Sequence, residues 1–249
     1  MHRVLKAVIP AAGLGTRFYP KTKVTPKELL PVGGKPVLQY VVEEVIGAGI
    51  EEVIVVANPK KKGIEEFFRD RRHPRATFVF QEEPLGLGHA IGCASQAVGD
   101  EPFVVVLPDV LVVNPVSALN QLFKGCGSHS WGMLLERVAK ERISSYGVID
   151  GCEEGEEGVY RIRGAVEKPR PEEAPSDLAI LGRYLLTPEI FSFVRDSKKG
   201  TLGEIQLTDA IDRLAKNHEG VGIVCRGQLF DVGTPEGLLR ANSYFSFRS

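Results

Sequence analysis

The chain has 249 residues, 43% hydrophobic and 25% charged, which is the composition of an ordinary globular protein with a sizeable core. Its 31 basic and 32 acidic side chains leave a net charge of −1, which excludes a global attraction to nucleic acid or to a membrane surface. Any site for an anion must therefore be a local cluster of cations.

Short β-branched runs alternate with helix-like segments through the first half of the chain. Apolar runs of strand length predict strands at 5–10, 51–57, 77–81 and 102–108. Apolar residues at helical spacing predict helices at 35–50, 61–70, 87–98 and 115–123. Continuous apolar strands joined by helices predict an α/β fold, a Rossmann-like three-layer sandwich whose central sheet is mostly parallel.

The alternation loosens after about residue 126. Strands are predicted at 130–138, 146–150, 159–169 and 178–186, and helices at 188–196 and 204–217. A last pair of strands, "VGIVCRG" and "LFDVG", precedes a closing helix that starts with "PEGLL". Because no flexible linker interrupts the pattern, we predict a single domain over residues 1–249, with one half at about 1–125 and a second at about 126–249, on one continuous sheet.

The first strand leads into a glycine-containing loop, "AAGLGTRFYPKTKVTPKELLP". Gly13 and Gly15 supply G-x-G, but Phe18 stands where the third glycine of a dinucleotide fingerprint belongs. A dehydrogenase would also carry an acidic residue after the second strand, where Ala57 and Asn58 stand. No G-K-[ST] follows the glycines, so the loop is not a Walker A phosphate loop either.

Four cations in this loop indicate phosphate: Arg17, Lys21, Lys23 and Lys27. Three prolines in the same segment oppose a helix, so we predict an extended loop. Arg17 and Lys27 would then reach back over the strand ends, while Lys21 and Lys23 would face solvent. The alternative is a solvated basic loop with no ligand.

Eight stretches in order resemble the signature of the sugar-nucleotide pyrophosphorylases (nucleoside-triphosphate sugar-1-phosphate nucleotidylyltransferases). They are "GLGTR…P…PKELLPV…KP", "QEEPLGLGHA", "LPDV", "YGVID", "VEKP", "APSDLAILGRYLL", "GEIQLTDAI" and "FDVGTPEG". The resemblance covers nearly the whole chain and is greatest to the bacterial-type branch that acts on UTP and glucose 1-phosphate. It implies uridylyl transfer by in-line attack assisted by Mg²⁺, giving UDP-glucose and pyrophosphate. The first half would then bind the nucleotide and the second the sugar.

Gln81 ends a predicted strand, and its amide offers both a donor and an acceptor, so it can recognise the edge of a base. Glycines allow backbone N–H groups to approach a ligand closely. The alternative is a polar strand end followed by a glycine-rich helix start. The resemblance implies nucleotide binding by Ala12, Gly13, Gly15, Glu28, Gln81 and Gly86.

Two aspartates end apolar strands, Asp109 in "LPDV" and Asp231 in "LFDVG". Carboxylates are the ligands that Mg²⁺ prefers, and the resemblance implies that both aspartates hold that ion. The alternative for either residue is a hydrogen bond within a turn. "DVGT" is closer to the thymidylyl branch of the family, which leaves the choice of nucleotide open.

Glu167 and Lys168 are adjacent in "VEKP", so in a regular strand their side chains would point to opposite faces. A twist or a bulge before Pro169 could bring both to one site, and a surface ion pair is the alternative. The resemblance implies that Glu167 binds sugar hydroxyls and Lys168 the sugar phosphate, with Gly147 and Ile180 beside the sugar. The helix at 204–217, which carries Thr208, is interpreted as mostly structural, with an edge of the sugar pocket as the alternative. His89 is interpreted as a capping or packing residue.

The resemblance implies catalytic roles for three cations. Arg17 and Lys27 would neutralise the departing phosphates, and Lys168 would orient the attacking one. Two alternatives stay open: a thymidylyltransferase or other sugar-1-phosphate nucleotidyltransferase of the same mechanism, and a non-catalytic homologue that binds sugar nucleotides. The expected partners are the small molecules UTP and glucose 1-phosphate, with no nucleic acid; a homo-oligomer, dimer or tetramer, is left open.

No apolar run in the sequence reaches the length of a membrane span or of a signal-peptide core. The four cysteines lie apart, without a C-x-x-C spacing that would indicate zinc or redox chemistry. We therefore expect a cytoplasmic protein with reduced thiols and no membrane partner.

Overall fold

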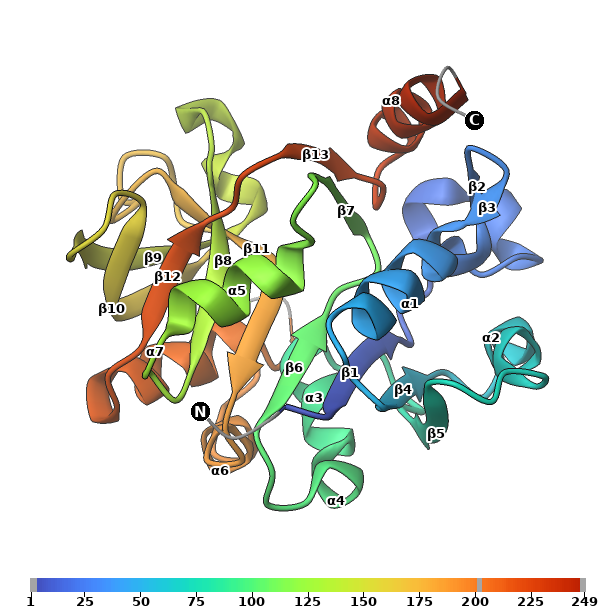
Figure 1. Ribbon diagram of the computed structural model, residues 1–249, viewed down its shortest axis with the longest axis horizontal. Coiled ribbons are helices and arrows are strands. Elements are labelled where there is room, and N and C mark those ends of the chain that lie inside the picture. The colour runs from blue at the N-terminus through green and yellow to red at the C-terminus, as the bar shows by residue number, and fades with distance from the viewer. Residues whose placement is uncertain (1–3, 201–202, 247–249) are drawn as a thin grey trace.

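The computed structural model describes residues 4–200 and 203–246, and its central element is a nine-stranded sheet (Figure 1). In spatial order its strands are β5 (Arg75–Phe80), β4 (Glu52–Ala57), β1 (Lys6–Ala11), β6 (Phe103–Val106), β11 (Leu178–Leu186), β8 (Gly132–Arg137), β12 (Val221–Val224), β10 (Val159–Glu167) and β9 (Gly147–Glu153). Both halves of the sequence therefore contribute strands to the same sheet.

The sheet changes character between the two halves. β5, β4, β1 and β6 are all parallel, as the alternating pattern predicts. Beyond them, β11 is antiparallel to β6 and β8, and β10 is antiparallel to β12 and β9, while β8 and β12 are parallel. The prediction of a mostly parallel sheet is therefore wrong for the second half. The short connection 154–158 between β9 and β10 has no room for a crossover helix, which a parallel pair would need.

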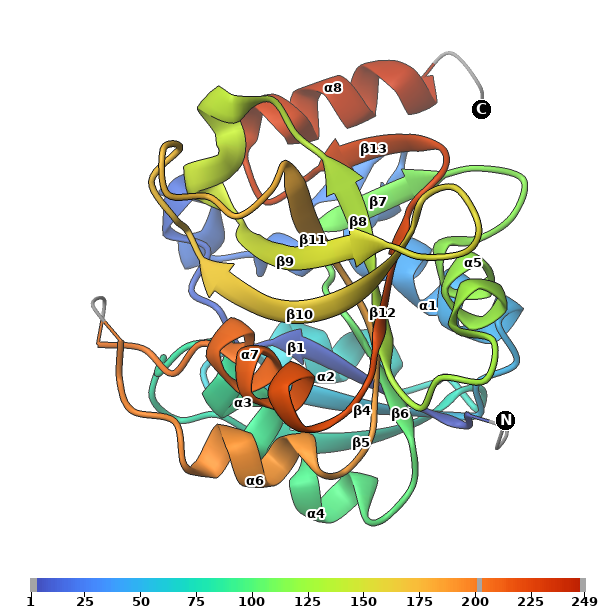
Figure 2. The same ribbon diagram turned by 90° about the vertical axis from the view of Figure 1, so that its left-hand side faces the viewer.

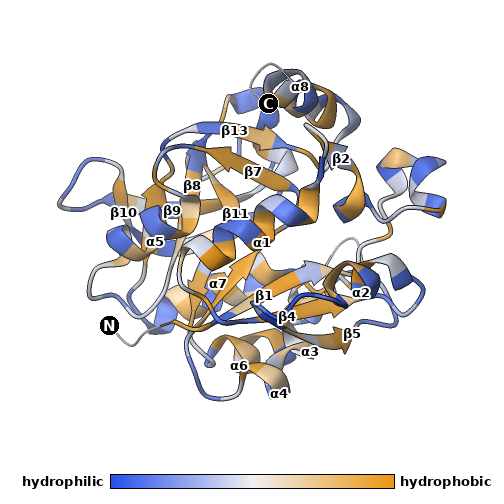
Figure 3. Ribbon diagram, turned by 45° about the vertical axis from the view of Figure 1, so that its right-hand side comes forward, coloured by the Kyte–Doolittle hydropathy of each residue, from blue (hydrophilic) through white to orange (hydrophobic). Residues whose placement is uncertain are grey.

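Helices cover both faces of the sheet (Figure 2). Successive residues of a strand point to opposite faces, so Val8 of β1 joins one core cluster while Ala7 and Ile9 join the other. One face carries α1 (Val37–Gly47), α2 (Lys62–Phe68) and α5 (Ala118–Cys126). The other carries α3 (Leu87–Cys93), α4 (Ser95–Val98), α6 (Ile190–Arg195) and α7 (Leu207–Asn217). The α/β layers are thus confirmed, and Figure 3 shows the apolar strands enclosed between the helices.

The loop after β1 is not extended, contrary to the prediction from its prolines. It forms three single 3-10 turns, η1 (Thr16–Phe18), η2 (Lys21–Lys23) and η3 (Lys27–Leu29). Proline excludes a continuous α-helix but not a tight turn, and the carbonyl of Pro26 accepts the amide of Leu29 at 2.9 Å. Phe18 in η1 is buried.

The two last strands do not pair with each other, which corrects a further prediction. β12 lies within the main sheet, whereas β13 (Gln228–Asp231) leaves it and pairs antiparallel with β7 (Val110–Val113). The strand predicted at 102–108 ends before β7, and no separate strand was predicted there. A hairpin, β2 (Pro31–Val32) and β3 (Lys35–Pro36), packs with this pair beneath α8 (Pro235–Ser246), at the top of Figure 1.

All four cysteines are free in the structure, as expected. Across the described ranges, no helix combines the length and the apolar character needed to cross a bilayer.

Gly220 has no room for a side chain, because a Cβ there would lie 2.1 Å from the ring of the buried Trp131. We expect Gly220→Ala to lower the free energy of unfolding by about 1–3 kcal/mol through overpacking. The chain has a single tryptophan, so urea unfolding followed by its fluorescence measures the effect directly. Gly47→Ala is the control: its Cβ would meet open space in α1, and it should stabilise the fold by about 0.5 kcal/mol. Equal midpoints for the two variants would contradict the packing argument.

Candidate active site

A cavity of about 960 Å³ lies where the two halves of the sheet meet. Five residues line it from the first half, and the rest of its wall comes from the second half; the five are Arg17, Leu87, Leu107, Asp109 and Val110. The cavity is thus placed beyond the carboxyl end of β6, as is common for ligand sites in parallel sheets. It brings together seven of the residues predicted from the sequence: Arg17, Asp109, Gly147, Glu167, Lys168, Ile180 and Asp231.

Asp109 and Asp231 converge because β7 pairs with β13. The register places Asp231 opposite Val110, the residue that follows Asp109. Gly233 separates the carboxylates: a Cβ there would lie 3.1 Å from Oδ1 of Asp231 and 3.3 Å from Oδ2 of Asp109. The Gly233 amide donates to Oδ1 of Asp231 at 3.0 Å. Burial, together with the nearby charge of Asp109, raises the pKa of Asp231 above its usual value.

Lys27 forms an ion pair with Asp109, with 3.0 Å between Nζ and Oδ2. Burial acts to raise the pKa of Asp109, but the charge and hydrogen bond of Lys27 outweigh it and lower that pKa. Burial likewise acts to lower the pKa of Lys27, and the charges of Asp109 and Glu28 raise it overall. Both partners are therefore held in their charged forms.

The two aspartates fit a divalent cation of the kind that prefers oxygen ligands. Their carboxylates flank a space that a side chain on residue 233 would fill, and one of them is already neutralised by an ammonium. Among residues 4–200 and 203–246, no group of three or more His, Cys, Asp or Glu side chains could hold a metal ion. A cation between the aspartates would therefore need oxygens from a ligand and from water, which suits Mg²⁺.

Glu167 and Lys168 both face the cavity, and the backbone explains how adjacent residues can do so. Lys168 has φ 46°, the only positive φ at a non-glycine residue in the described part of the chain. This left-handed conformation at the end of β10 turns the Lys168 side chain toward that of Glu167, with 3.3 Å between Nζ and Oε1. The twist or bulge predicted to bring both side chains to one site is thus a single unusual backbone conformation, of the kind that clusters at functional sites.

Thr208 fixes the other side of Glu167. Thr208 belongs to α7, and its hydroxyl donates to Oε2 of Glu167 at 2.6 Å. A Cβ at Gly147 would lie 2.8 Å from that hydroxyl and 3.1 Å from Oε2, so only glycine leaves the pair its space. Ile180 is buried beside them, 3.2 Å from the same position. The helical spacing of α7 favoured a packing role for Thr208, with an edge of the sugar pocket as the alternative, and Thr208 lines the cavity.

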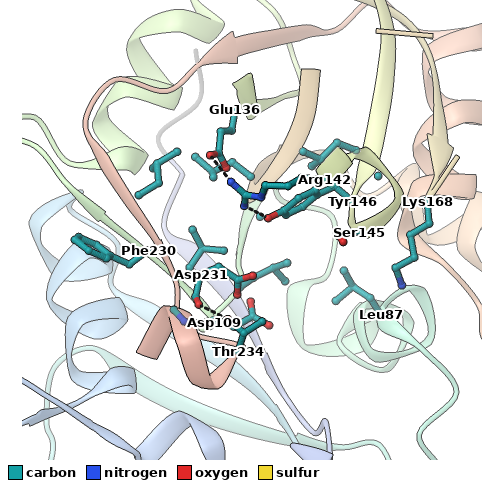
Figure 4. Close-up of a pocket in the computed structure, with 18 of the residues that line it drawn as sticks. Leu87, Asp109, Glu136, Arg142, Ser145, Tyr146, Lys168, Phe230, Asp231 and Thr234 are labelled. Atoms are coloured by element: carbon teal, nitrogen blue, oxygen red, sulfur yellow. Dashed lines mark hydrogen bonds and ion pairs between the residues drawn. The ribbon is translucent and has the colours of Figure 1, made fainter. Parts of the chain in front are cut away.

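A turn, η4 (Lys140–Ser145), carries a further cation into the cavity (Figure 4). The guanidinium of Arg142 donates to the hydroxyl of Tyr146 and lies 3.9 Å from Glu136. Burial raises the pKa of Glu136, although Arg142 opposes that shift. No sequence pattern indicated Arg142 or Glu136, since charged residues in a turn and at a strand end are ordinary surface features.

The residues expected to recognise the base lie outside the cavity lining. Gln81 is buried; its amide nitrogen donates to the carbonyl of Gly86 at 3.0 Å and lies 2.9 Å from Nδ1 of His89. A Cβ at Gly86 would come within 2.6 Å of the carbonyl oxygen of Ile205, and the Gly88 amide donates to that oxygen at 2.8 Å. These glycines therefore allow close chain packing in this structure, and their contact with a nucleotide stays a prediction.

Glu28 is also buried, at 1% exposure, and acts within the protein. Its carboxylate lies 3.1 Å from Nζ of Lys61, which also donates to the carbonyl of Ala11 at the end of β1. Glu28 thus ties the cationic loop to the sheet, and a direct contact with the nucleotide stays a prediction.

The other residues predicted in the loop after β1 lie within its first two turns or just before them. Ala12 is buried and Gly13 is exposed, with its Cβ position 4.0 Å from Cε of Lys27. Gly15 has φ 66° and accepts the Thr22 hydroxyl at 2.6 Å, so it forms the turn that presents Arg17. Lys21 and Lys23 are exposed, as predicted.

Comparison with known proteins adds independent evidence. The family model described as nucleotidyl transferase matches residues 6–246. UTP–glucose-1-phosphate uridylyltransferase of Bacillus subtilis (strain 168) is 39% identical over 100% of this chain and 93% of its own length. The protein of the same name from Streptococcus pneumoniae serotype 4 is 40% identical over 99% of this chain and 91% of its own. A crystal structure of UDP-glucose pyrophosphorylase complexed with UDP-glucose superposes with a TM-score of 0.92 at 39% identity, covering 99% of this chain and 100% of that one.

Lys27→Met should raise the pKa of Asp109, because it removes the charge and the hydrogen bond that lower it. Carboxyl ¹³C NMR shifts followed against pH measure this directly. Since the folded-state pKa of Asp109 is lowered, its pairing stabilises the fold above the unfolded pKa, and this stabilisation is lost as the pH falls through the folded pKa. Wild type and variant should therefore converge in stability at acid pH. Lys21→Met removes the same charge from an exposed position and should leave Asp109 unchanged; an equal shift in both would refute the assignment.

Proposed function

The chain belongs to the nucleotidyl transferase family, and from that premise we propose that it transfers a uridylyl group from UTP to glucose 1-phosphate. The observation that carries this proposal is the convergence, in one cavity, of a cationic loop, two facing aspartates and a Glu–Lys pair from the second half. The names of its relatives at about 40% identity over the full chain support the two substrates.

In the proposed reaction, a phosphate oxygen of glucose 1-phosphate attacks the α-phosphorus of UTP in line. The new P–O bond forms as the bond from the α-phosphorus to the oxygen bridging to the β-phosphate breaks. The electron pair leaves with that oxygen, and the products are UDP-glucose and pyrophosphate. No proton has to be removed from the nucleophile, so catalysis rests on positioning two anions and on stabilising the departing charge.

Three cations divide this task. We assign Arg17 and Lys27 to the β- and γ-phosphates of UTP, because both belong to the loop after β1, Arg17 lines the cavity and Lys27 is paired with Asp109. Lys168, which lines the cavity after the end of β10 (Figure 4), would bind the phosphate of the sugar. The planar fork of Arg17 suits phosphate oxygens better than an ammonium does, so lysine should not replace it.

The sugar would be recognised by Glu167. Its carboxylate is fixed between the Thr208 hydroxyl and the Lys168 ammonium, which leaves it able to accept hydrogen bonds from sugar hydroxyls. Gly147 and Ile180 would form the surface against which the ring rests. The amide of Gln81 would recognise the uracil edge after exchanging its bond to Gly86, and Ala12, Gly13 and Gly15 would offer backbone to the nucleotide.

Asp109 and Asp231 would hold Mg²⁺, and the ion when bound would supply positive charge to phosphate oxygens of both substrates. Neighbouring residues of the protein set the spacing of these two carboxylates, the orientation of one and the ionisation of the other. Gly233 leaves space between the carboxylates and orients Asp231 through its amide, and Lys27 keeps Asp109 ionised.

Arg17→Ala and Lys168→Ala should each lower kcat/KM by about 100-fold or more, because each removes a fixed cation from developing phosphate charge. Arg17→Lys should recover little. Turnover is followed as pyrophosphate release from UTP and glucose 1-phosphate, and thermal melting checks that the fold persists. Lys21→Ala, an exposed cation of the same loop, is the matched control and should keep full activity. Normal turnover by Arg17→Ala or Lys168→Ala would remove that residue from the mechanism.

A matrix of UTP, dTTP, ATP and GTP against several sugar 1-phosphates tests the substrates. We expect the highest kcat/KM for UTP with glucose 1-phosphate. A preference for dTTP would instead favour the thymidylyl branch, to which the "DVGT" segment is closer. Binding of UDP-glucose without pyrophosphate release in any combination would indicate a non-catalytic homologue.

A further inference from the structure

Arg183 is a completely buried arginine that lines no part of the cavity. It lies on β11, and its guanidinium donates to both carboxylate oxygens of Glu44 on α1, at 3.3 and 2.8 Å. Two further bonds run to the backbone, to the carbonyl of Leu107 at 3.0 Å and to that of Val110 at 2.8 Å. With no exposed surface, Arg183 contacts no substrate, and its role must be exerted through these neighbours.

The two carbonyls bracket Asp109. They belong to the residues at either end of the segment Leu107–Val110, which joins β6 to β7 and carries the proposed metal ligand. Within it, Pro108 has no amide hydrogen and cannot anchor the chain by a backbone donor. The amide of Leu107 donates to Gly182, the residue before Arg183, at 2.9 Å.

β11 is irregular where it makes these contacts. Its register with β8 shifts between Ile180 and Tyr184, and Gly182 has φ 82°. A Cβ at Gly182 would lie 2.9 Å from the side chain of Leu107, so the close approach of the two segments requires glycine. The distortion of β11 and the guanidinium of Arg183 therefore act on the same segment.

We propose that Arg183 is a positioning residue for Asp109: its guanidinium clamps the Leu107–Val110 segment so that the Asp109 carboxylate stays beside Asp231. The inference rests on the proposed role of these aspartates in binding the metal with UTP. Asp109 is fixed from two directions, since Lys27 holds its carboxylate and Arg183 holds its backbone.

The chemistry of arginine suits this role. Its rigid fork of donors reaches two carbonyls and both oxygens of Glu44 at once, which a single lysine ammonium on a flexible stem cannot do. A buried ion pair is a weak source of stability, because apolar residues of similar volume often serve as well. Stability of the core therefore does not explain an arginine here, whereas precise placement of the Asp109 segment does.

The experiment measures UTP binding by calorimetry with the full chain and without glucose 1-phosphate, once with Mn²⁺ and once with EDTA. The ratio of the two Kd values isolates the contribution of the metal. In Arg183→Met/Glu44→Met, which removes the buried pair together, we expect that ratio to fall by about 10- to 100-fold, the usual effect of losing a group that orients a metal ligand. The metal-free affinity should change by less than about twofold, as for a site that is otherwise unperturbed.

Three further variants make the result decisive, and thermal melting checks that each one folds. Arg183→Lys keeps a charge for Glu44 but cannot bond both carbonyls, so the ratio of the two Kd values should fall, though less than in the double variant. Because it keeps the charge, this variant tests the proposal if the double variant does not fold. Glu44→Gln keeps the bonds from Arg183 to the carbonyls and should lower the melting temperature while retaining the Mn²⁺ effect. Asp109→Asn should abolish the Mn²⁺ effect.

The outcomes separate the clamp from the function it serves. Should Asp109→Asn retain the Mn²⁺ effect, the proposed metal site is refuted and the clamp with it. Should Asp109→Asn lose the effect while the folded Arg183 variants retain it, the metal site stands and the clamp is refuted. A loss of metal-free UTP affinity equal to the loss with Mn²⁺ would assign Arg183 a structural role alone.

Discussion

Two carboxylates that lie on either side of the space beside Gly233, those of Asp109 and Asp231, set the constraint on which the site depends. Like charges at such range repel, and burial adds to the cost, as the raised pKa of Asp231 reflects. The pairing of β7 with β13 fixes the two backbones regardless of that repulsion. Lys27 then compensates the charge of Asp109, and Arg17 and Arg142 act on Asp231 from farther away.

The change of sheet direction after β6 gives the two halves different uses. Parallel strands all end at one edge, so the first half presents its loops there, including the cationic turns and Asp109. Antiparallel strands run past that edge, so β10 and β11 can carry Glu167 and Ile180 directly against the cavity. Since one sheet contains both sets, strand register determines how far apart the residues proposed to bind phosphate and sugar lie.

Local patterns in the sequence predicted what depends on neighbours in the chain: most strands and helices, the α/β layers, and Asp109 at a strand end. They failed where a distant partner decides the structure. Nothing near residue 229 reveals that β13 leaves the main sheet for β7, and Thr208 has a meaning only when Glu167 lies across from it. Lys168 is a third case. The alternation of side chains along a strand predicts that Glu167 and Lys168 point to opposite faces, and the left-handed backbone of Lys168 lets both face the cavity.

Three ion pairs, each of one cation and one anion, extend from the cavity into the protein. They are Lys61–Glu28, Lys27–Asp109 and Arg183–Glu44. The pairs also act on one another, since Glu28 raises the pKa of Lys27 and Arg183 lowers that of Asp109. The inner members of the network therefore interact with opposite charges in two pairs, and the network joins the ends of β1 and β6 to β11; these members are Glu28, Lys27, Asp109 and Arg183. Removing one member leaves its neighbours uncompensated, so the effects of substitutions along this line should not add independently.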